Sequence, residues 1–537
     1  MSTTNAQTNS GHAHDEAHSR GSTIDAFFAG TVILLTGATD FLGKALLEKL
    51  LRSCPVAAIF VLIRPKRNKS IEQRFESVIA RNINTASVVE LAKTPVSEIP
   101  RSPRLRVFDR IQSEFPDTLK KIFPVKGDVS LPELGLEPDD RKMLLDKVNI
   151  VFHSAATVRF NEPLKIAVNL NVMGTDRMLD LCRRMTNLIS VIHVSTAYSN
   201  ADRLEIEESI YTTEVKPHTV VHMCENLDDE TIKITEKKLI GKHPNTYTFT
   251  KNLAEQIVMK KGKNLPIAIV RPSIICAANQ DPFPGWIDNI NGITGIMTAI
   301  AQGTVRSIVC NAKLKIDVVP VDFVVNTMIC ASWSNFVQRT KRIKVYNCTS
   351  STLHPITWNE FGYLIKKYST EFPSKHVMWY PGFTFRTNKF IHAIVRATLH
   401  FLPAFILDLI SRARSHKSIM LKLTKRIDLS AQTGEFFSTH EWIWRVDNMI
   451  ALMEFASTHE SCRNFEVNIQ NMDWDMYLQR YILGIRKYIL KENLDTLPYA
   501  RSRLKKLYLV LQCAKILGFV ALFESLKYLC RTIVWKT

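Results

Sequence analysis

The stretch Thr36-Gly37-Ala38-Thr39-Asp40-Phe41-Leu42-Gly43 decides the fold that this sequence predicts. It follows the apolar run VILLT (32–36), which is typical of a buried strand, and it leads into LGKALLEKLLRSC (42–54), which has apolar residues at helical spacing. A glycine turn between a strand and a helix directs backbone N–H groups and the helix N-terminus at a phosphate group. We therefore predict a nucleotide-binding turn at residues 36–43.

The alternation of apolar runs and helical segments continues beyond this turn. The further runs are AAIFVLI (57–63), NIVFHS (149–154), ISVIHVS (189–195) and PIAIVRPS (266–273). Such runs are typical of buried parallel strands, and a helix between two of them makes the crossover that parallel pairing requires. The predicted fold is α/β, with a doubly wound, Rossmann-type parallel sheet.

Helical patterns replace the strand patterns after about residue 360, so we predict a second, mainly helical region that ends in a hydrophobic tail. Two of its segments are apolar enough for membrane contact. For 390–410, which contains Arg396 and Pro403, a buried helix and a membrane contact remain equally open. The segment 507–523 has basic residues on both flanks, which favours a tail that spans or lies on a membrane.

The composition limits the classes of function. A chain of 537 residues is longer than one ordinary domain, and its net charge of +19 suits nucleic acid, an anionic membrane or an acidic small molecule. The basic residues are dispersed and no nucleic-acid module is recognised, so nucleic-acid binding is the weakest of these hypotheses. Ten cysteines without a C-x-x-C pair indicate reduced thiols. No metal site is expected, because His12, His14 and His18 lie in a very polar stretch.

Candidate cofactor-binding residues begin at the glycine turn. Those in the turn are Thr36, Gly37, Thr39, Asp40, Phe41, Leu42 and Gly43. Asp40 stands where a T-G-x-x-G-x-x-G fingerprint has its middle glycine. Its carboxylate would repel a phosphate unless the side chain turns away, for instance to cap the helix. We expect Asp40 to weaken cofactor binding.

Two later strand ends supply further cofactor candidates. Arg64 and Lys66 follow the second strand, where an acidic residue would bind the free ribose 2′-hydroxyl of NAD. Their cations suit the 2′-phosphate of NADP instead, although a solvated basic loop is the alternative. Asp128, in Gly127-Asp128-Val129, follows a further strand that we expect between the runs 57–63 and 149–154, and it is a candidate for contact with the adenine. The predicted cofactor is NADPH.

A tyrosine and a lysine supply the reactive pair. Tyr247 and Lys251 are four residues apart, which puts them on one face of a helix. We expect the Lys251 ammonium to lower the pKa of Tyr247, which would then protonate a carbonyl oxygen as hydride arrives. Ser195 and Thr196 end an apolar strand and could hold that carbonyl, with Thr196 favoured. Asn171 is expected to support the lysine through a water molecule.

Longer stretches of the chain resemble one family of the extended short-chain dehydrogenases/reductases, the fatty acyl-CoA reductases. The similar stretches are VFHSAATVRFNEPL (151–164), NVMGT (171–175), HVSTAYSN (193–200), YTFTKNLAE (247–255), RPSIICAANQDPFPGWIDN (271–289), DVVPVDFVVN (317–326), VMWYPG (377–382) and MDWDMYLQRYILGIRKYILKE (472–492). The resemblance covers roughly residues 25–500. Its last stretch is similar to the C-terminal "male sterility" domain of that family.

The resemblance implies NADPH-dependent reduction of a long-chain or very-long-chain fatty acyl-CoA to a primary alcohol, with release of CoA. It places the catalytic roles on Tyr247, Lys251 and Thr196. It places cofactor binding on Thr36, Gly37, Phe41, Leu42, Gly43, Arg64 and Asp128. Two successive reductions at one site require the intermediate aldehyde to be retained, and we expect a hydrophobic tunnel built partly by the helical region.

Composition, hydropathy and the resemblance together predict four parts and a location. Residues 1–24 are expected to be a disordered tail, 25–360 the NAD(P)-binding and catalytic domain, 361–500 the helical domain, and 501–537 a basic, hydrophobic membrane-associated tail. The first 22 residues contain no apolar run and therefore no secretory signal. The expected location is the peroxisomal or endoplasmic reticulum membrane, with the catalytic domain in the cytosol.

Two alternatives remain open for the function. A sugar-nucleotide or steroid enzyme of the same extended family would use the same tyrosine and lysine, but the stretch PGWIDN and the long helical region argue against it. A catalytically silent relative that binds lipid at a membrane is supported by Asp40 alone.

Overall fold

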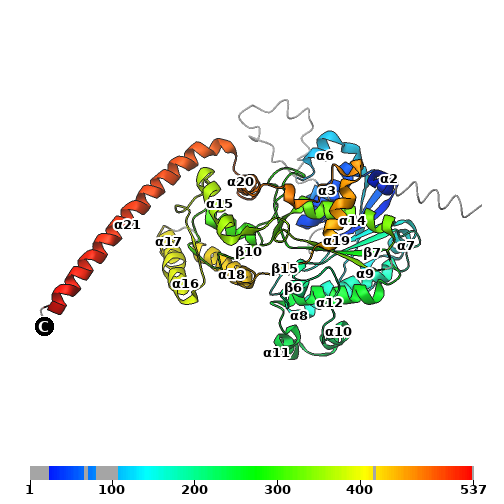
Figure 1. Ribbon diagram of the computed structural model, residues 1–537, viewed down its shortest axis with the longest axis horizontal. Helices are drawn as coiled ribbons and strands as arrows, with labels where there is room; N and C mark the ends of the chain where they lie inside the picture. Colours follow the sequence, from blue (N-terminus) through cyan, green and yellow to red (C-terminus); the bar gives the residue numbers. More distant parts are fainter. Residues whose placement is uncertain (1–22, 66–69, 80–106, 341, 415–418, 535–537) are drawn as a thin grey trace, which may run out of the picture. The chain divides into compact units, whose positions relative to one another are not determined.

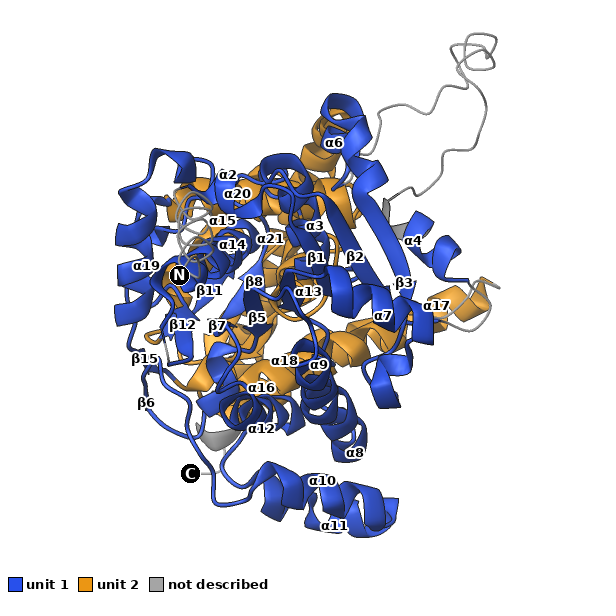
Figure 2. Ribbon diagram, turned by 90° about the vertical axis from the view of Figure 1, so that its right-hand side faces the viewer, with its two compact units in different colours: residues 1–286, 315–356, 441–472 blue, residues 287–314, 357–440, 473–537 orange. Residues whose placement is uncertain are grey.

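The computed structural model describes residues 23–65, 70–79, 107–340, 342–414 and 419–534, and it divides the chain into two compact units (Figure 2). Unit 1 comprises residues 1–286, 315–356 and 441–472, and unit 2 comprises 287–314, 357–440 and 473–537. Most of the predicted N-terminal tail lies outside the described residues. Helix α2 (Ile24–Phe28) begins at the end of that segment, with Thr23 as its N-cap.

Unit 1 is built on one parallel sheet of seven strands. In spatial order these are β12 (Lys344–Cys348), β7 (Ile267–Pro272), β5 (Ser190–Val194), β4 (Ile150–His153), β1 (Val32–Thr36), β2 (Ala58–Ile63) and β3 (Ile122–Lys126). All six neighbouring pairs are parallel. The strand order reverses between β1 and β4, and ligands of open α/β sheets bind at the carboxyl ends of the strands beside such a reversal.

Helices cover both faces of this sheet, which confirms the predicted doubly wound fold (Figures 1 and 2). The remaining helices of unit 1 are α3 (Phe41–Ser53), α4 (Ile71–Ile79), α6 (Asp109–Glu114), α7 (Pro138–Lys147), α8 (Leu164–Ala167), α9 (Gly174–Cys182), α10 (Pro217–Asn226), α11 (Asp229–Ile240), α12 (Thr246–Lys261), α14 (Val321–Gln338) and α19 (Asp447–Ser457). Helices α3 and α14 pack together on one face, and α9 and α12 pack together on the other. The latter face is closed by a buried apolar cluster that includes Leu34, Val151 and Leu179.

A buried ion pair fixes α12 to the sheet. Arg271 on β7 donates to both carboxylate oxygens of Glu255 on α12, at 2.8 and 2.6 Å, and both side chains are fully buried. A bidentate pair of this kind sets orientation as well as distance, and removing either partner would leave an uncompensated buried charge. The pair therefore holds the helix that carries Tyr247 and Lys251.

Unit 2 is mainly helical. Its helices are α13 (Ile293–Ala301), α15 (Trp358–Glu371), α16 (Lys389–Val395), α17 (Leu402–Ala413), α18 (Met420–Thr439), α20 (Trp474–Gly484) and α21 (Leu497–Val534), and a π-helical turn, η5 (Arg396–Phe401), joins α16 to α17. Short strands β9 (Ser307–Val309) and β14 (Thr384–Arg386) pair in parallel within it. Figure 1 shows α21 as one continuous helix, coloured orange to red.

In the part of the chain that the structure describes, two helical stretches, both in unit 2, are long and apolar enough to cross a membrane, by length and composition. They are Lys389–Ala413 and Leu494–Tyr528, and only 11% and 0% of their most apolar windows is buried. Of the two alternatives for 390–410, a buried helix is therefore wrong. The second stretch contains the predicted tail segment 507–523.

The units do not follow the single boundary expected near residue 360. Segment 441–472 belongs to unit 1, where Phe455 of α19 packs against Trp333 of α14 with ring centroids 4.6 Å apart. Segment 287–314 belongs to unit 2 although it precedes that boundary. Strand β12 was not predicted, because Lys344 and Asn347 interrupt its apolar pattern.

Candidate active site

The glycine turn between β1 and α3 is as tight as its sequence predicts. Gly37 has φ +77°, and a Cβ there would lie 3.0 Å from backbone atoms of Ser154 and Ala155, which follow β4. A Cβ on Gly43 would lie 2.1 Å from the Gly37 carbonyl oxygen. Only glycine fits both positions, so the turn brings the α3 N-terminus close to the ends of β1 and β4. This geometry fits a dinucleotide pyrophosphate.

The other candidates in the turn take different places. Asp40 is exposed at the N-cap position, yet within the described helix α3 its carboxylate accepts no hydrogen bond from the first-turn N–H groups. Capping of the helix, the example given for how this carboxylate could turn away from a phosphate, is therefore not observed, and weaker cofactor binding through Asp40 stays a prediction. Thr39 is half-buried, Leu42 is buried, and the ring of Phe41 stacks on Trp286 with centroids 5.0 Å apart.

Thr36 joins the two strands at the reversal of strand order. Its buried hydroxyl oxygen accepts hydrogen bonds from the backbone N–H groups of Ser154 and Ala155, both at 3.1 Å, and lies 2.9 Å from Nδ1 of His153. Burial and the charge of Lys251 lower the pKa of His153 to about 3, so this ring is neutral. The buried Thr36 hydroxyl thus holds the segment after β4 against the end of β1, where the glycine turn begins.

Charged residues lie together near the ends of β2 and β3. Arg64 Nε lies 3.8 Å from the Asp128 carboxylate, and Asp128 also accepts hydrogen bonds from Ser130. Arg74 of α4, which sequence analysis missed, donates to the Arg64 carbonyl oxygen. Lys66 lies outside the described residues. The structure therefore brings Arg64, Asp128 and Arg74 together.

Tyr247 and Lys251 lie at the carboxyl end of β5. Asn245 caps α12 and so fixes the start of the helix that carries both residues. The buried Lys251 ammonium donates to the Val194 carbonyl oxygen at 2.8 Å. Tyr247 is half-buried, hydrogen-bonds with Thr196, and stacks on Phe160 with ring centroids 5.8 Å apart. The structure therefore brings Tyr247, Lys251 and Thr196 together.

The pKa values of this pair differ from the expectation. Burial raises the pKa of Tyr247 to about 12, and the hydrogen bond with Thr196 opposes that rise only in part. Burial also lowers the pKa of Lys251 to about 8, against the effect of Glu255. The expected lowering of the Tyr247 pKa by Lys251 is wrong, because the ammonium is directed at a backbone carbonyl and burial disfavours the phenolate. Tyr247 consequently keeps its proton at neutral pH.

Ser195 points away from this group. Its hydroxyl donates to Glu255, the carboxylate that is paired with Arg271, and Ser199 donates to the same oxygen at 3.0 Å. Thr196 is the hydroxyl on the Tyr247 side. The geometry therefore favours Thr196 over Ser195 for contact with a substrate carbonyl.

Asn171 is buried in the π-helical turn η3 (Val168–Met173). Its amide accepts from the Thr157 N–H group at 2.9 Å and donates to the Thr250 hydroxyl at 3.0 Å. These bonds tie the segment after β4 to α12. A role of Asn171 on Lys251 through water stays a prediction.

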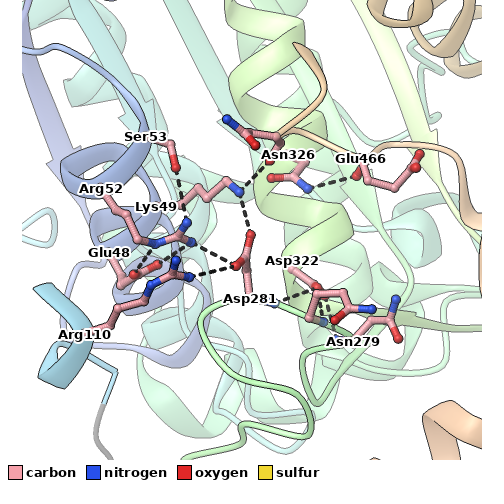
Figure 3. Close-up of polar contacts among 12 residues, drawn as sticks. Glu48, Lys49, Arg52, Ser53, Arg110, Asn279, Asp281, Asp322, Asn326 and Glu466 are labelled. Carbon is pink, nitrogen blue, oxygen red and sulfur yellow. Dashed lines mark hydrogen bonds and ion pairs between the residues drawn. The ribbon is translucent and has the colours of Figure 1, made fainter. Parts of the chain in front are cut away.

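A second polar network, drawn in Figure 3, fixes the loop that contains the PGW motif. Asp322, at the start of α14, accepts hydrogen bonds from the backbone N–H groups of residues 279–281, at 2.7 to 3.1 Å. Lys49 and Arg52 of α3 contact the Asp281 carboxylate at 2.6 and 3.1 Å. Burial alone would raise the pKa of Asp281, but these two cations hold it below its usual value. The loop is thereby held against the helix that begins at the glycine turn.

Sequence analysis missed several of these residues, and only one of those missed could have been predicted from its spacing. Glu255 lies four residues after Lys251 on the same face of α12, so its spacing marks it. The partners Arg271 and Asp281 gave no such signal, because they come from distant segments. Among the described residues, no cluster of His, Cys, Asp and Glu could hold a metal ion. His12, His14 and His18 lie outside them.

Comparison with known proteins identifies the family. Two family models described as male sterility protein match residues 35–328 and 399–492, the first of them an NAD-binding model. The chain is 38% identical to fatty acyl-CoA reductase 1 of Rattus norvegicus, over 90% of this chain and 89% of that one, and 37% identical to fatty acyl-CoA reductase 2 of Homo sapiens, over 90% of each. The chain belongs to the fatty acyl-CoA reductase family. It is thus an oxidoreductase with a nicotinamide cofactor.

Solved structures agree on the fold of this fatty acyl-CoA reductase family member. The terminal reductase domain of the myxalamid biosynthetic pathway matches with a TM-score of 0.56 at 17% identity, over 86% of this chain and 92% of that one. A reductase domain of a nonribosomal peptide synthetase from Mycobacterium tuberculosis matches with a TM-score of 0.55 at 16% identity, over 89% and 96%. At such identities the likeness establishes the fold alone.

Replacement of Asp40 tests the charge in the glycine turn. We predict that Asp40→Gly and Asp40→Asn each bind the nicotinamide cofactor about two- to tenfold more tightly than the natural chain, because a carboxylate beside the pyrophosphate is removed. Fluorescence titration measures the affinities. Asp40→Gly removes the charge and also makes the backbone more flexible, whereas Asp40→Asn removes the charge at nearly the same side-chain size. Comparison of the two variants separates these effects. Equal or tighter binding by the natural chain would show that the carboxylate does not repel the cofactor.

Proposed function

We propose that the chain reduces long-chain or very-long-chain fatty acyl-CoA to the primary alcohol with NADPH, releasing CoA. The observation that carries the proposal is the position of a protonated phenol, Tyr247, beside the Thr196 hydroxyl at the carboxyl end of β5, with Lys251 one helical turn away. This is the arrangement that protonation of a carbonyl oxygen requires. The activity named for the relatives supplies the substrate class.

The chain's own residues then have distinct tasks. When bound, the cofactor supplies hydride to the carbonyl carbon. Thr196 donates a hydrogen bond to the thioester carbonyl oxygen, and Tyr247 transfers its phenolic proton to that oxygen. The product of this first reduction is a hemithioacetal, which breaks its C–S bond to give the aldehyde and CoA with its thiol proton.

The second reduction uses the same residues. The aldehyde carbonyl oxygen takes the place of the thioester oxygen between Thr196 and Tyr247, and a second hydride and proton give the primary alcohol. Two NADPH molecules are therefore oxidised for each alcohol formed and each CoA released. Between the two steps the Tyr247 phenolate takes up a proton from water, and its high pKa favours this return to the acid form.

The preference for NADPH is supported by the charges at the ends of β2 and β3. Arg64 is more than half exposed, and the Arg74 guanidinium contacts its backbone. Guanidinium groups bind phosphate oxygens through paired hydrogen bonds. We assign the ribose 2′-phosphate to this pair, and the adenine to the neighbourhood of Asp128.

Membrane association is the second part of the proposal. Helix α21 carries the apolar segment 507–523 and is unburied over its most apolar window, while Arg501 and Arg503 at its base bond to carbonyl groups of unit 2. We propose that α21 anchors the chain to a peroxisomal or endoplasmic reticulum membrane, with unit 1 in the cytosol.

A single substitution tests the cofactor preference. We predict that Arg64→Ala weakens NADPH binding by about tenfold or more and leaves NADH binding unchanged, because only NADPH carries the phosphate that the guanidinium would bind. Isothermal titration with both cofactors measures this. Lys120→Ala, an exposed cation elsewhere in unit 1, is the control. An equal loss for both cofactors would exclude phosphate recognition by Arg64.

A product assay tests the reaction. We predict that the full chain in phospholipid vesicles converts palmitoyl-CoA and NADPH to hexadecanol, with two NADPH oxidised for each CoA thiol released. Tyr247→Phe is expected to lower alcohol formation by about 10²- to 10⁴-fold, the contribution of a positioned acid, while cofactor binding persists. Tyr363→Phe, on the surface of unit 2, is the matched control.

Three outcomes of that assay would contradict the proposal. Normal cofactor binding without NADPH oxidation would favour a catalytically silent relative. Accumulation of free aldehyde as the sole product would remove the second reduction. Retention of most activity in Tyr247→Phe would remove Tyr247 from the acid role.

A further inference from the structure

The helix Lys389–Ala413 of unit 2 is amphipathic in the reverse of the usual sense. Its outward face consists of large apolar side chains that are each 43% to 75% exposed: Phe390, Ile391, Ile394, Leu399, Leu402, Phe405, Ile406, Leu407, Leu409 and Ile410. We call this set the apolar face. A helix on the surface of a soluble domain buries such residues against the core and exposes its polar residues.

The side of the helix that packs on unit 2 is polar instead. Its members recur every fourth residue: His392, Arg396, His400 and Asp408, with only Ala404 between the last two. We call them the polar stripe. His392 lies 2.9 Å from the Ser307 hydroxyl, and His400 accepts a hydrogen bond from the backbone N–H group of Arg306 at 2.8 Å. The first half of the helix is therefore bonded to the β9 segment.

Two other members of the polar stripe, Arg396 and Asp408, are bonded to α18 or to its first residues. Arg396 lies 3.4 Å from the Asp428 carboxylate. Asp408 is 3% exposed, and it accepts hydrogen bonds from the backbone N–H groups of Met420 and Leu421, the first residues of α18, at 2.8 and 2.9 Å. These bonds run along most of the helix, so its orientation on unit 2 is specified. The exposure of the apolar face is a consequence of that orientation.

We propose that the apolar face lies on an anionic phospholipid surface and is a second membrane contact, separate from α21. The apolar side chains would enter the boundary between headgroups and acyl chains, as in helices that lie in the plane of an interface. Crossing the bilayer would require the polar stripe to leave its partners on β9 and α18, so the helix lies flat.

Charge supports a lipid surface as the occupant of this face. Lys389, Arg412 and Arg414 flank the apolar face and are exposed, and so are Lys422, Lys425 and Arg426 on α18. Cations at the edge of an apolar helix face attract the headgroups of anionic lipids. Lipid contact at this face rests on the proposed membrane association, but it does not rest on the proposed reaction.

Site-directed labelling of the full chain tests this contact. An environment-sensitive fluorophore is attached at Phe405→Cys or, independently, at Leu409→Cys, in chains whose Cys513 and Cys530 are replaced by Ser. Ile234→Cys, on the exposed surface of α11 in unit 1, is the control. The natural Cys513, exposed on α21, reports on the tail when only Cys530 is replaced. Each chain is mixed with vesicles of equal parts phosphatidylcholine and phosphatidylserine.

We expect the labels at 405 and 409 to shift to the blue and to lose most of their quenching by iodide when vesicles are added, while the label at 234 is unchanged. Continued iodide quenching at 405 and 409, with the Cys513 label protected, would overturn the second contact and leave the tail proposal intact. Protection at 405 and 409 without vesicles, rising with protein concentration, would show that a second copy of the chain covers the face, and would also overturn the proposal.

Discussion

The site depends on one constraint, the burial of the Lys251 ammonium beneath the end of β5. A buried cation is costly unless it is hydrogen-bonded, and the Val194 carbonyl oxygen accepts a hydrogen bond from Lys251 at 2.8 Å. The same bond sets the rotation of α12 against the sheet. One turn earlier on that helix, Tyr247 is thereby held beside Thr196, and one turn later Glu255 is held against Arg271. The phenol of Tyr247 and the Glu255 carboxylate of the buried ion pair are therefore carried by the same helix, α12.

Burial shifts the pKa values of Tyr247 and Lys251 in opposite directions. It raises the pKa of Tyr247 to about 12 and lowers that of Lys251 to about 8, so the phenol remains an acid and the amine titrates near neutral pH. The shifts arise because burial disfavours the charged form of each group. The sequence predicted the opposite sign for Tyr247, since spacing along a helix reveals that two groups are neighbours but not what surrounds them.

The sequence predicted features that depend on residues close together along the chain, and it missed features that depend on contacts between distant segments. The strands β1, β2, β4, β5 and β7 were predictable because buried parallel strands are continuous apolar runs. Strand β12 was not, because its Asn347 is satisfied by the carbonyl groups of Ile206 and Arg445, which are distant in sequence. Likewise the four-residue spacing predicted Tyr247 and Lys251, whereas the contact of Lys49 with Asp281 required the fold.

Apolar composition had a similar limit in unit 2. It indicated that residues 390–410 form an apolar helix, but not which side faces the protein. The polar stripe answers this, since its hydrogen bonds hold the apolar side chains outward. The proposed chemistry and the proposed membrane attachment thus lie on different units of the chain. Lys251 is buried in unit 1, and the outward apolar face belongs to unit 2.

The most direct measurement of the central claim is the pH dependence of kcat/KM for acyl-CoA reduction. In this account the charged Lys251 holds Tyr247 in place through its hydrogen bond to the Val194 carbonyl. Lys251 is charged below its pKa of about 8, so we expect kcat/KM to fall with a slope of one above that pH. In Lys251→Arg the guanidinium stays charged over the whole range, and the fall should disappear whatever rate remains. A profile of the natural chain that is flat to pH 10, or a fall that persists unchanged in Lys251→Arg, would contradict the role of this buried ammonium.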